Sequence, residues 1–415
     1  MERKASLIIS PKIAIVHDIL PFRGGAERTL EAMLEVLPGA RVFTLVYNRR
    51  RFTDSPIKSY SVQTSFVNRL PFAAQYYRNY LPILPWAVEQ FDLSEFDIVI
   101  SSSYAVAHGV LSRPDQLHLS ITYSPLRQAW NHYHEFTRKN RKFNAVLSLP
   151  ARAILHYLRL WDRAAADRVD HYIAISNWVA KMIWRYYRRE AEVIYPPVDI
   201  HRFKPSADRG EFYLAVSRLV THKRVALIKE AFTKLKYPLV IVGDGPEKRK
   251  IFSGKPENIQ VIGWQSEENL RRLMGSAKAF VHAAEEDFGM VLVEAQASGC
   301  PVIAYGRGAA GEIVIPGKTG ILYSESTVDG LVDAIERFEA GRSSFAVNEL
   351  MENARRFERN LFKEKFSQTI EREWLHFSER NLIGVQGGRW GLNPQPSDPQ
   401  SDALPVELRP PFTNN

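Results

Sequence analysis

Short runs of β-branched and apolar residues alternate with stretches of helical spacing along most of this chain, and this alternation restricts the folds open to it. Runs with strand character stand at 12–17, 97–102, 117–123, 171–176, 212–217, 239–242, 258–263 and 279–282. Helical spacing is found at 27–37, 177–188, 225–236, 267–274, 328–339, 345–356 and 362–377. Strands that alternate with helices of this length build parallel sheets covered by helices on both faces. The sequence therefore predicts an α/β fold with two doubly wound, Rossmann-like domains facing a central crevice, where the ligand binds.

Two prolines and a late change in composition indicate where these domains begin and end. The pair Pro196-Pro197 cannot continue a central strand, and the alternation restarts after it. A chain of 415 residues is long enough for two sizeable cores. We expect a first domain over 11–195, a second over 196–361, a C-terminal helix over 362–382 and a disordered tail, rich in Pro, Gly and polar residues, over 383–415.

The stretch 281–303 reads VHAAEEDFGMVLVEAQASGCPVI and predicts a strand, a loop, a helix and a second strand. Gly289 lets a ligand approach closely, and the N–H groups of Phe288, Gly289 and Met290 stand free at the start of the helix, where an anion is favoured. Glu286 and Glu294 can each accept hydrogen bonds from hydroxyl groups. This combination fits a nucleotide sugar. Two glutamates at this spacing are usually plain surface residues, and only the surrounding FG and EAxAxGxPVI sequence favours the functional interpretation.

Basic and glycine-rich segments after other predicted strands add to this candidate donor site. Arg218 and Lys223 follow the strand at 212–217, where both would face the crevice and neutralise a diphosphate. Glycine-rich turns follow three further strands, and they contain Gly24 and Gly25, Gly243, and Gly306-Arg307-Gly308. Each signal is weak alone, because an R-x4-K pair usually lies on a surface and a glycine pair often marks a plain turn.

The stretch 281–303 resembles the E-x7-E motif of retaining GT-B glycosyltransferases of the family 4 type, and the resemblance extends over about 12–377. It implies that Glu286 lies beside the donor sugar and Glu294 binds the ribose, while Arg218 and Lys223 bind the diphosphate and stabilise its departure. The segments DFG and AQASGCPVIAYG are most similar to those of mannosyltransferase-type members, including members that assemble bacterial surface polysaccharides such as lipopolysaccharide O-antigen. The resemblance thus implies transfer of mannose from GDP-mannose, without a metal or other cofactor, and a C-terminal helix that crosses back to the first domain.

One position departs from the family pattern. Where the family usually has His-Thr/Ser-Pro-x-Arg followed by Trp, this chain has Tyr123-Ser-Pro-Leu-Arg127. A tyrosine hydroxyl can donate a hydrogen bond but does not hold a proton near neutral pH as imidazole does. Tyr123 and Arg127 are therefore the acceptor-side candidates, and a non-catalytic subunit that binds a nucleotide sugar or a glycan stays open as a second function. A glycosidase is a further alternative, but it has no use for diphosphate-binding side chains.

Charge is concentrated in one segment of this basic chain. The net charge is +9, and the segment 127–189 alone carries 13 Lys and Arg against 4 Asp and Glu, interleaved with nine Trp and Tyr. Such a segment suits an anionic membrane surface, where a glycan or polyprenyl-diphosphate-linked acceptor would be met. A solvated face with buried aromatic residues is an equally good interpretation. We expect peripheral binding at the inner face of the cell membrane.

Other features exclude several classes of protein. No uninterrupted apolar run of about 18 residues is present, so no membrane-spanning helix is expected. The single cysteine, Cys300, excludes an internal disulfide and a cysteine-based metal site, and no Asp-x-Asp motif stands near the candidate donor residues. No nucleic-acid recognition motif accompanies the basic segment, so nucleic acid is not an expected partner. These features predict a cytoplasmic protein.

Overall fold

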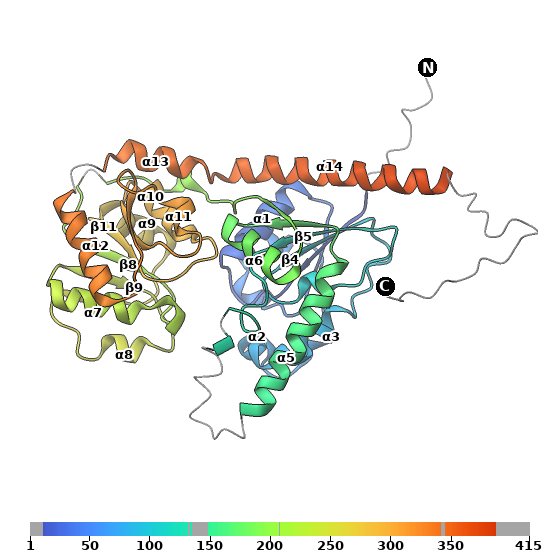
Figure 1. The fold of residues 1–415 in the computed structure, drawn as a ribbon, viewed down its shortest axis with the longest axis horizontal. Helices are drawn as coiled ribbons and strands as arrows, with labels where there is room; N and C mark the ends of the chain where they lie inside the picture. Colours follow the sequence, from blue (N-terminus) through green and yellow to red (C-terminus); the bar gives the residue numbers. More distant parts are fainter. Residues whose placement is uncertain (1–10, 132, 135–147, 207, 342–344, 387–415) are drawn as a thin grey trace, which may run out of the picture. The chain divides into compact units, whose positions relative to one another are not determined.

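The computed structural model describes residues 11–131, 133–134, 148–206, 208–341 and 345–386. The chain up to Trp374 forms one compact unit, and the residues from Leu375 onward form a second. The first unit holds two parallel sheets, one in the blue-to-green part of the chain and one in the yellow-to-orange part (Figure 1). We refer to the regions built on them as the first half and the second half.

The first sheet has seven strands in the order β3-β2-β1-β4-β5-β6-β7, and every neighbouring pair is parallel. The chain thus starts in the middle and winds outward in both directions, with a switch point between β1 and β4. The strands are β1 (Ile13–His17), β2 (Arg41–Thr44), β3 (Val62–Thr64), β4 (Ile98–Ser103), β5 (Leu117–Thr122), β6 (His171–Ala174) and β7 (Ala191–Val193).

The second sheet repeats this plan with six parallel strands in the order β10-β9-β8-β11-β12-β13. Its switch point lies between β8 and β11, so the loops after these strands border the same crevice edge. The strands are β8 (Tyr213–Val216), β9 (Leu239–Val242), β10 (Ile259–Ile262), β11 (Ala279–His282), β12 (Val302–Tyr305) and β13 (Gly320–Tyr323). The two parallel sheets confirm the predicted α/β fold.

Helices connect the strands and cover the sheets (Figure 1). In the first half the α-helices are α1 (Gly25–Val36), α2 (Ala73–Tyr76), α3 (Leu84–Val88), α5 (Ser148–Ala165) and α6 (Asn177–Tyr187). In the second half they are α7 (Val225–Leu235), α8 (Lys248–Phe252), α9 (Glu267–Ser276), α10 (Met290–Ala297), α11 (Ala310–Ile313), α12 (Val328–Ala340) and α13 (Val347–Arg355). The last helix is α14 (Arg359–Gln386).

Burial explains why these segments are strands. All six residues of β4 and all six of β5 are buried, which is typical of a parallel sheet with helices on both faces. The polar residues among them are paired: His118 Nε2 lies 3.0 Å from Ser101 Oγ, and its Nδ1 lies 3.0 Å from the carbonyl oxygen of Arg168. Buried polar groups require such partners. His118 is therefore part of the core of the first half.

Part of α14 contacts the first half. Arg359 forms an ion pair with Glu35 at 2.6 Å, and Arg372 forms one with Glu192 at 2.6 Å. The helix begins three residues before the predicted start and continues to Gln386, so 383–386, which we expected in the disordered tail, are helical. The rest of that predicted tail, 387–415, lies outside the described residues.

Candidate active site

The loop between β11 and α10 carries Glu286, and a glycine turn fixes its backbone. The N–H of Ala309 donates to the carbonyl oxygen of Glu286 at 2.8 Å, and Gly308 pairs with Glu286 in an isolated parallel bridge. Gly308 has φ +85°, and a Cβ there would lie 2.3 Å from the Glu286 carbonyl oxygen. Only glycine permits this approach. The Gly306-Arg307-Gly308 turn, which we expected to touch phosphates, therefore supports the Glu286 loop.

The Glu286 carboxylate is held by two basic side chains. The Lys223 ammonium contacts its Oε1, and His282 Nε2 lies 2.8 Å from the same oxygen. Burial acts to raise the pKa of Glu286, but the Lys223 charge and the His282 imidazole outweigh it and lower the pKa well below its usual value. Glu286 is thus ionised and accepts hydrogen bonds. His282 was missed by the sequence analysis, although it ends β11 only four residues before Glu286.

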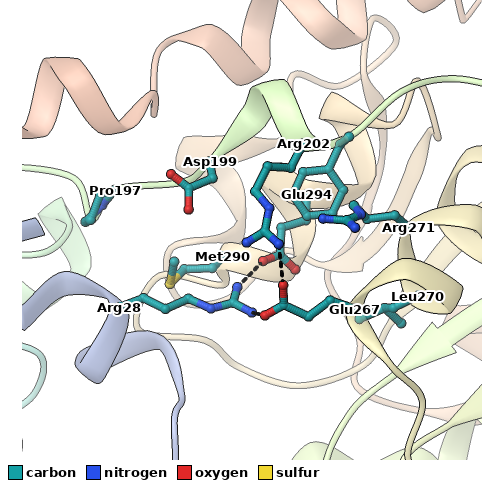
Figure 2. Close-up of a pocket in the computed structure, with 10 residues that line it drawn as sticks. Arg28, Pro197, Asp199, Arg202, Glu267, Leu270, Arg271, Met290 and Glu294 are labelled. Carbon is teal, nitrogen blue, oxygen red and sulfur yellow. Dashed lines mark hydrogen bonds and ion pairs between the residues drawn. The ribbon is translucent and has the colours of Figure 1, made fainter. Parts of the chain in front are cut away.

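The start of α10 is formed as the sequence indicated. Gly289 precedes the helix with φ +96°, which leaves the first N–H groups of α10 directed away from the helix body. The ring of Phe288 is buried and stacks on Tyr195 with 5.8 Å between ring centroids. The side chain of Phe288 thus anchors the loop, while Met290 and Glu294 line a pocket beside the helix (Figure 2).

Two glycines hold the loop that carries Arg218. A Cβ at Gly243 would lie 1.9 Å from the carbonyl oxygen of Ser217, and one at Gly245 would lie 2.5 Å from that of Leu219. The turn after β9 therefore packs directly on the backbone on either side of Arg218. Gly243, a donor-binding candidate, has a packing role here that requires no ligand.

Arg218 and the turn with Gly24 and Gly25 come from different halves and lie close together. The Arg218 guanidinium stands over the ring of Phe22, 5.7 Å from its centroid. Partial burial and the nearby guanidinium of Arg78 lower the pKa of Arg218. A Cβ at Gly25 would lie 2.9 Å from Met290 Sδ, so this turn also meets the start of α10. An anion bound here would meet several positive charges and free N–H groups at once.

Glu294 is paired with the first half. Arg28 Nη1 in α1 donates to Glu294 Oε1 at 2.9 Å (Figure 2). Burial raises the pKa of Glu294, and Arg28 acts against that rise. Arg28 was not among the predicted site residues. Its contact with Glu294 spans 266 positions of sequence, so no local pattern could have indicated it.

The acceptor-side candidates differ in their surroundings. The Tyr123 hydroxyl is buried and lies 3.0 Å from Ser102 Oγ and 3.2 Å from the carbonyl oxygen of Ala26, and burial raises its pKa. Arg127 forms an ion pair with Asp287, the residue after Glu286. Arg127 is therefore brought to the candidate donor loop, whereas the hydroxyl of Tyr123 is engaged within the first half.

A carboxylate of the second half also caps a helix of the first half. Glu312 in α11 accepts hydrogen bonds from the backbone N–H groups of Asn177 and Trp178, both at 2.9 Å. Ser176 Oγ donates to the carbonyl oxygen of Asp287 at 2.5 Å. The two halves are thus joined by hydrogen bonds between side chains and backbone groups as well as by ion pairs.

Two further observations concern metal-ion sites and membrane-spanning helices. Within the described ranges, no three His, Cys, Asp or Glu side chains lie close enough together to hold a metal ion. Among the helices that the structure describes, none combines the length and the apolar character needed to span a bilayer.

Comparison with known proteins supports the two-domain fold. Residues 198–360 match the family model described as Glycosyl transferases group 1, and residues 23–202 match the one described as Glycosyltransferase Family 4. The two matches together cover both halves. HepE of Anabaena, solved in complex with UDP, shares the fold with a TM-score of 0.64 and 18% identity, over 87% of this chain and 99% of that one. The chain thus has the two-domain architecture of GT-B glycosyltransferases.

Curated relatives match part of this architecture. An uncharacterised glycosyltransferase of Methanocaldococcus jannaschii is 26% identical over 226 residues, which are 53% of this chain and 64% of the relative. A GDP-mannose-dependent alpha-mannosyltransferase of Mycobacterium tuberculosis is 30% identical over 205 residues, which are 46% of this chain and 52% of the relative. The chain therefore spans between half and two thirds of the length of these relatives.

Proposed function

We propose that the protein is a retaining glycosyltransferase that moves a sugar, mannose from GDP-mannose, to a glycan or lipid-linked acceptor. The observation that carries this proposal is the Lys223, Glu286 and His282 cluster beside the start of α10. It combines an ionised hydroxyl acceptor with an ammonium group and free N–H groups. A sugar diphosphate needs both kinds of contact.

The roles follow from the charges. An ammonium group has three donors, so Lys223 can hold Glu286 and a phosphate oxygen at the same time. Together with Arg218 it would stabilise the negative charge that grows on the departing diphosphate. Glu286, ionised and acceptor-only, would hold sugar hydroxyls, and Glu294 would hold the ribose. This division needs no metal ion, and transfer that is abolished by EDTA and restored by Mg²⁺ would contradict it.

The donor is the first quantity to measure. The Mycobacterium tuberculosis relative is named for GDP-mannose, whereas HepE of Anabaena was solved with UDP and with UDP-glucose. Isothermal titration of the purified protein with GDP-, UDP- and ADP-sugars separates these cases. We expect GDP-mannose to bind most tightly. Preference for a UDP-sugar would keep the reaction class and change the donor, and no binding of any of them would refute the proposal.

One observation favours the second function, a non-catalytic nucleotide-sugar or glycan-binding subunit. The Tyr123 hydroxyl already contacts Ser102 and the Ala26 carbonyl oxygen, so it offers an incoming acceptor less than a free imidazole would. A subunit of this kind binds the donor and never transfers the sugar. Incubation of the protein with radiolabelled donor and membrane-extracted glycolipid acceptors distinguishes the two functions, because only the enzyme labels lipid.

A membrane-linked acceptor is part of the proposal, and it depends on the aromatic and basic residues of 127–189 that are exposed. Seven of the nine Trp and Tyr residues of 127–189 are buried or half-buried, and two are exposed: Tyr157 in α5 and Trp184 in α6. Arg188 stands over the Trp184 ring, 4.7 Å from its centroid, and Arg185 is exposed beside it. Aromatic and basic groups in contact suit an anionic lipid surface.

Vesicle sedimentation tests this part. We expect the protein to pellet with vesicles of anionic lipid at low salt and to be released at high salt, because salt screens surface charges over about 10 Å or less. Replacing Arg185 and Arg188 by Glu should weaken sedimentation. The same exchange at Arg249 and Lys250, which are exposed in the second half, is the matched control. Wild-type protein that stays in the supernatant with excess anionic lipid contradicts membrane binding.

A further inference from the structure

Arg28 makes contacts that the proposed chemistry does not require. From helix α1 in the first half, its Nη1 donates to Glu294 Oε1 and its Nη2 donates to Glu267 Oε1, both at 2.9 Å (Figure 2). Glu294 is the carboxylate assigned to the donor ribose. The Arg28 guanidinium of the first half thus binds the Glu294 carboxylate of the second half, which the donor ribose would bind.

A second arginine strengthens this contact. Arg202 Nη2 lies 2.7 Å from Glu267 Oε2, so Glu267 bridges Arg28 and Arg202 with its two oxygens. Burial acts to raise the pKa of Glu267, but the charges of the neighbouring arginines keep it below its usual value. Glu267 is therefore ionised, and it holds the Arg28 guanidinium in the direction of Glu294.

Burial makes the Arg28 contact more than a surface ion pair. The Glu294 side chain is only 10% exposed, whereas that of Arg28 is 30% exposed. A carboxylate removed from water needs a compensating charge or hydrogen bonds. Without a donor, Arg28 supplies that compensation. With a donor, ribose hydroxyls could supply it instead.

The pocket around Glu294 leaves little room for a ribose beside the Arg28 guanidinium. The pocket lined by Arg28, Glu267, Met290 and Glu294 has a volume of about 30 Å³. Pockets for small ligands usually measure about 300–1,000 Å³. The pocket is narrow because α1 begins directly against α10, where a Cβ at Gly25 would lie 2.9 Å from Met290 Sδ. A ribose that approaches Glu294 would therefore compete with the Arg28 guanidinium for this space.

We propose that Arg28 is a latch that closes the ribose subsite in the absence of donor, so that donor binding requires release of Glu294 from Arg28. This inference rests on the proposed function, because it takes Glu294 as the ribose ligand. If only the unlatched form binds, the apparent dissociation constant of the donor is raised by the inverse of the unlatched fraction. Two partly exposed ion pairs of modest strength correspond to a factor of roughly five to ten.

The test compares variants of the full-length protein. Arg28→Met removes the guanidinium and keeps a stem, and Arg28→Lys keeps the positive charge but lacks the planar guanidinium fork. Arg272→Met is the matched control, because Arg272 lies on α9 with Glu267 but is exposed and lines a different pocket. Donor affinity is measured by calorimetry with GDP-mannose and with UDP-glucose. Small-angle X-ray scattering of the donor-free proteins reports independently whether the halves separate.

We expect Arg28→Met to bind the donor about five- to tenfold more tightly than wild type and to have a larger radius of gyration without donor. Arg28→Lys should fall between them, and Arg272→Met should match wild type within about twofold. Weaker donor binding by Arg28→Met would make Arg28 a donor ligand and overturn the latch. Unchanged affinity would also overturn it.

Failure of the proposed function gives a different pattern. If neither wild type nor Arg28→Met binds a nucleotide sugar, the function is refuted, and donor control by Arg28 is refuted with it. The scattering result then decides whether Arg28 closes the halves on each other at all. An unchanged radius of gyration in Arg28→Met removes that remaining role too.

Discussion

Replacement of Lys223 by Met will isolate the electrostatic part of the candidate site. The ammonium of Lys223 contacts the Glu286 carboxylate, and these side chains are 20% and 12% exposed. Met keeps a stem of similar length without the charge, so Glu286 retains only His282, 2.8 Å away. Loss of one partner of a fully buried pair costs about 3–5 kcal/mol. Because solvent reaches both side chains and His282 remains, we expect the free energy of unfolding to fall by about 2 kcal/mol.

The kcat of Lys223→Met should fall as well as its stability. Loss of one group that stabilises charge on the leaving diphosphate lowers kcat by about 10²- to 10³-fold. The pH profile should change as well, because Lys223 is the main charge that lowers the pKa of Glu286. Without it, burial raises that pKa, and activity will be lost as the pH falls through the raised value. Wild type, whose Glu286 pKa is lowered, keeps Glu286 ionised across the same range.

The assay follows sugar transfer from the nucleotide sugar that binds wild type, between pH 5 and pH 8, together with thermal unfolding by circular dichroism. Arg307→Met is the matched control: Arg307 pairs with Glu285 at 3.0 Å on the same loop, but its side chain is 64% exposed. Exposed pairs contribute about 1 kcal/mol or less, so this control should resemble wild type. A Lys223→Met protein with kcat within about threefold of wild type and a parallel pH profile would refute the assigned role.

Three further predictions concern single residues. Glu294→Ala should weaken donor binding more than Glu286→Ala does, whereas Glu286→Ala should mainly lower kcat, because contacts to the sugar strengthen in the transition state and contacts to the ribose do not. Equal effects of the two variants in steady-state kinetics would contradict the assignment of Glu294 to the ribose and Glu286 to the sugar. Gly308→Ala should lower kcat and cost about 1–3 kcal/mol of stability, more than Gly317→Ala, whose φ of +78° is similar but whose Cβ would meet nothing within 4 Å. Burial raises the pKa of Asp162 from 3.8 to about 7, so the stability that its protonated form contributes is lost as the pH rises. Between pH 5 and 8, the free energy of unfolding of wild type should fall by about 2–3 kcal/mol relative to that of Asp162→Asn in chemical unfolding, and parallel plots of this free energy against pH would disprove this.

The sequence indicated the central strands because they are buried on both faces. Runs such as those at 97–102 and 117–123 carry β-branched residues that need cover on each side, and they became β4 and β5. The strands β2, β3, β7 and β13 were missed. Three of them, β3, β7 and β13, stand at the edges of their sheets, whereas β2 lies inside the first sheet and is only four residues long. Edge strands bury less, so their sequences carry less pattern.

The site was indicated where chemistry and local sequence coincide. Glu286, Gly289 and Lys223 follow strand ends, where a pattern of a few residues identifies them. Arg28 could not be found in this way, because its partner Glu294 is brought near by the packing of the two halves. The interpretation of the basic segment was limited for a similar reason: sequence composition does not tell which Trp and Tyr residues are buried.

Helix α14 has a consequence for the order of events during synthesis. Arg359, Lys363 and Arg372 pair with Glu35 and Glu192 of the first half, yet Arg359 is added 166 residues after Val193, the last residue of β7. At about 5–20 residues per second, the ribosome reaches this helix about 10–30 s after finishing the first sheet. During that interval the nascent first half lacks the basic partners from α14, although His171 lies 3.2 Å from Glu192, and the surface under α14 is open to chaperones. Ribosome pausing within the second half would extend that exposure.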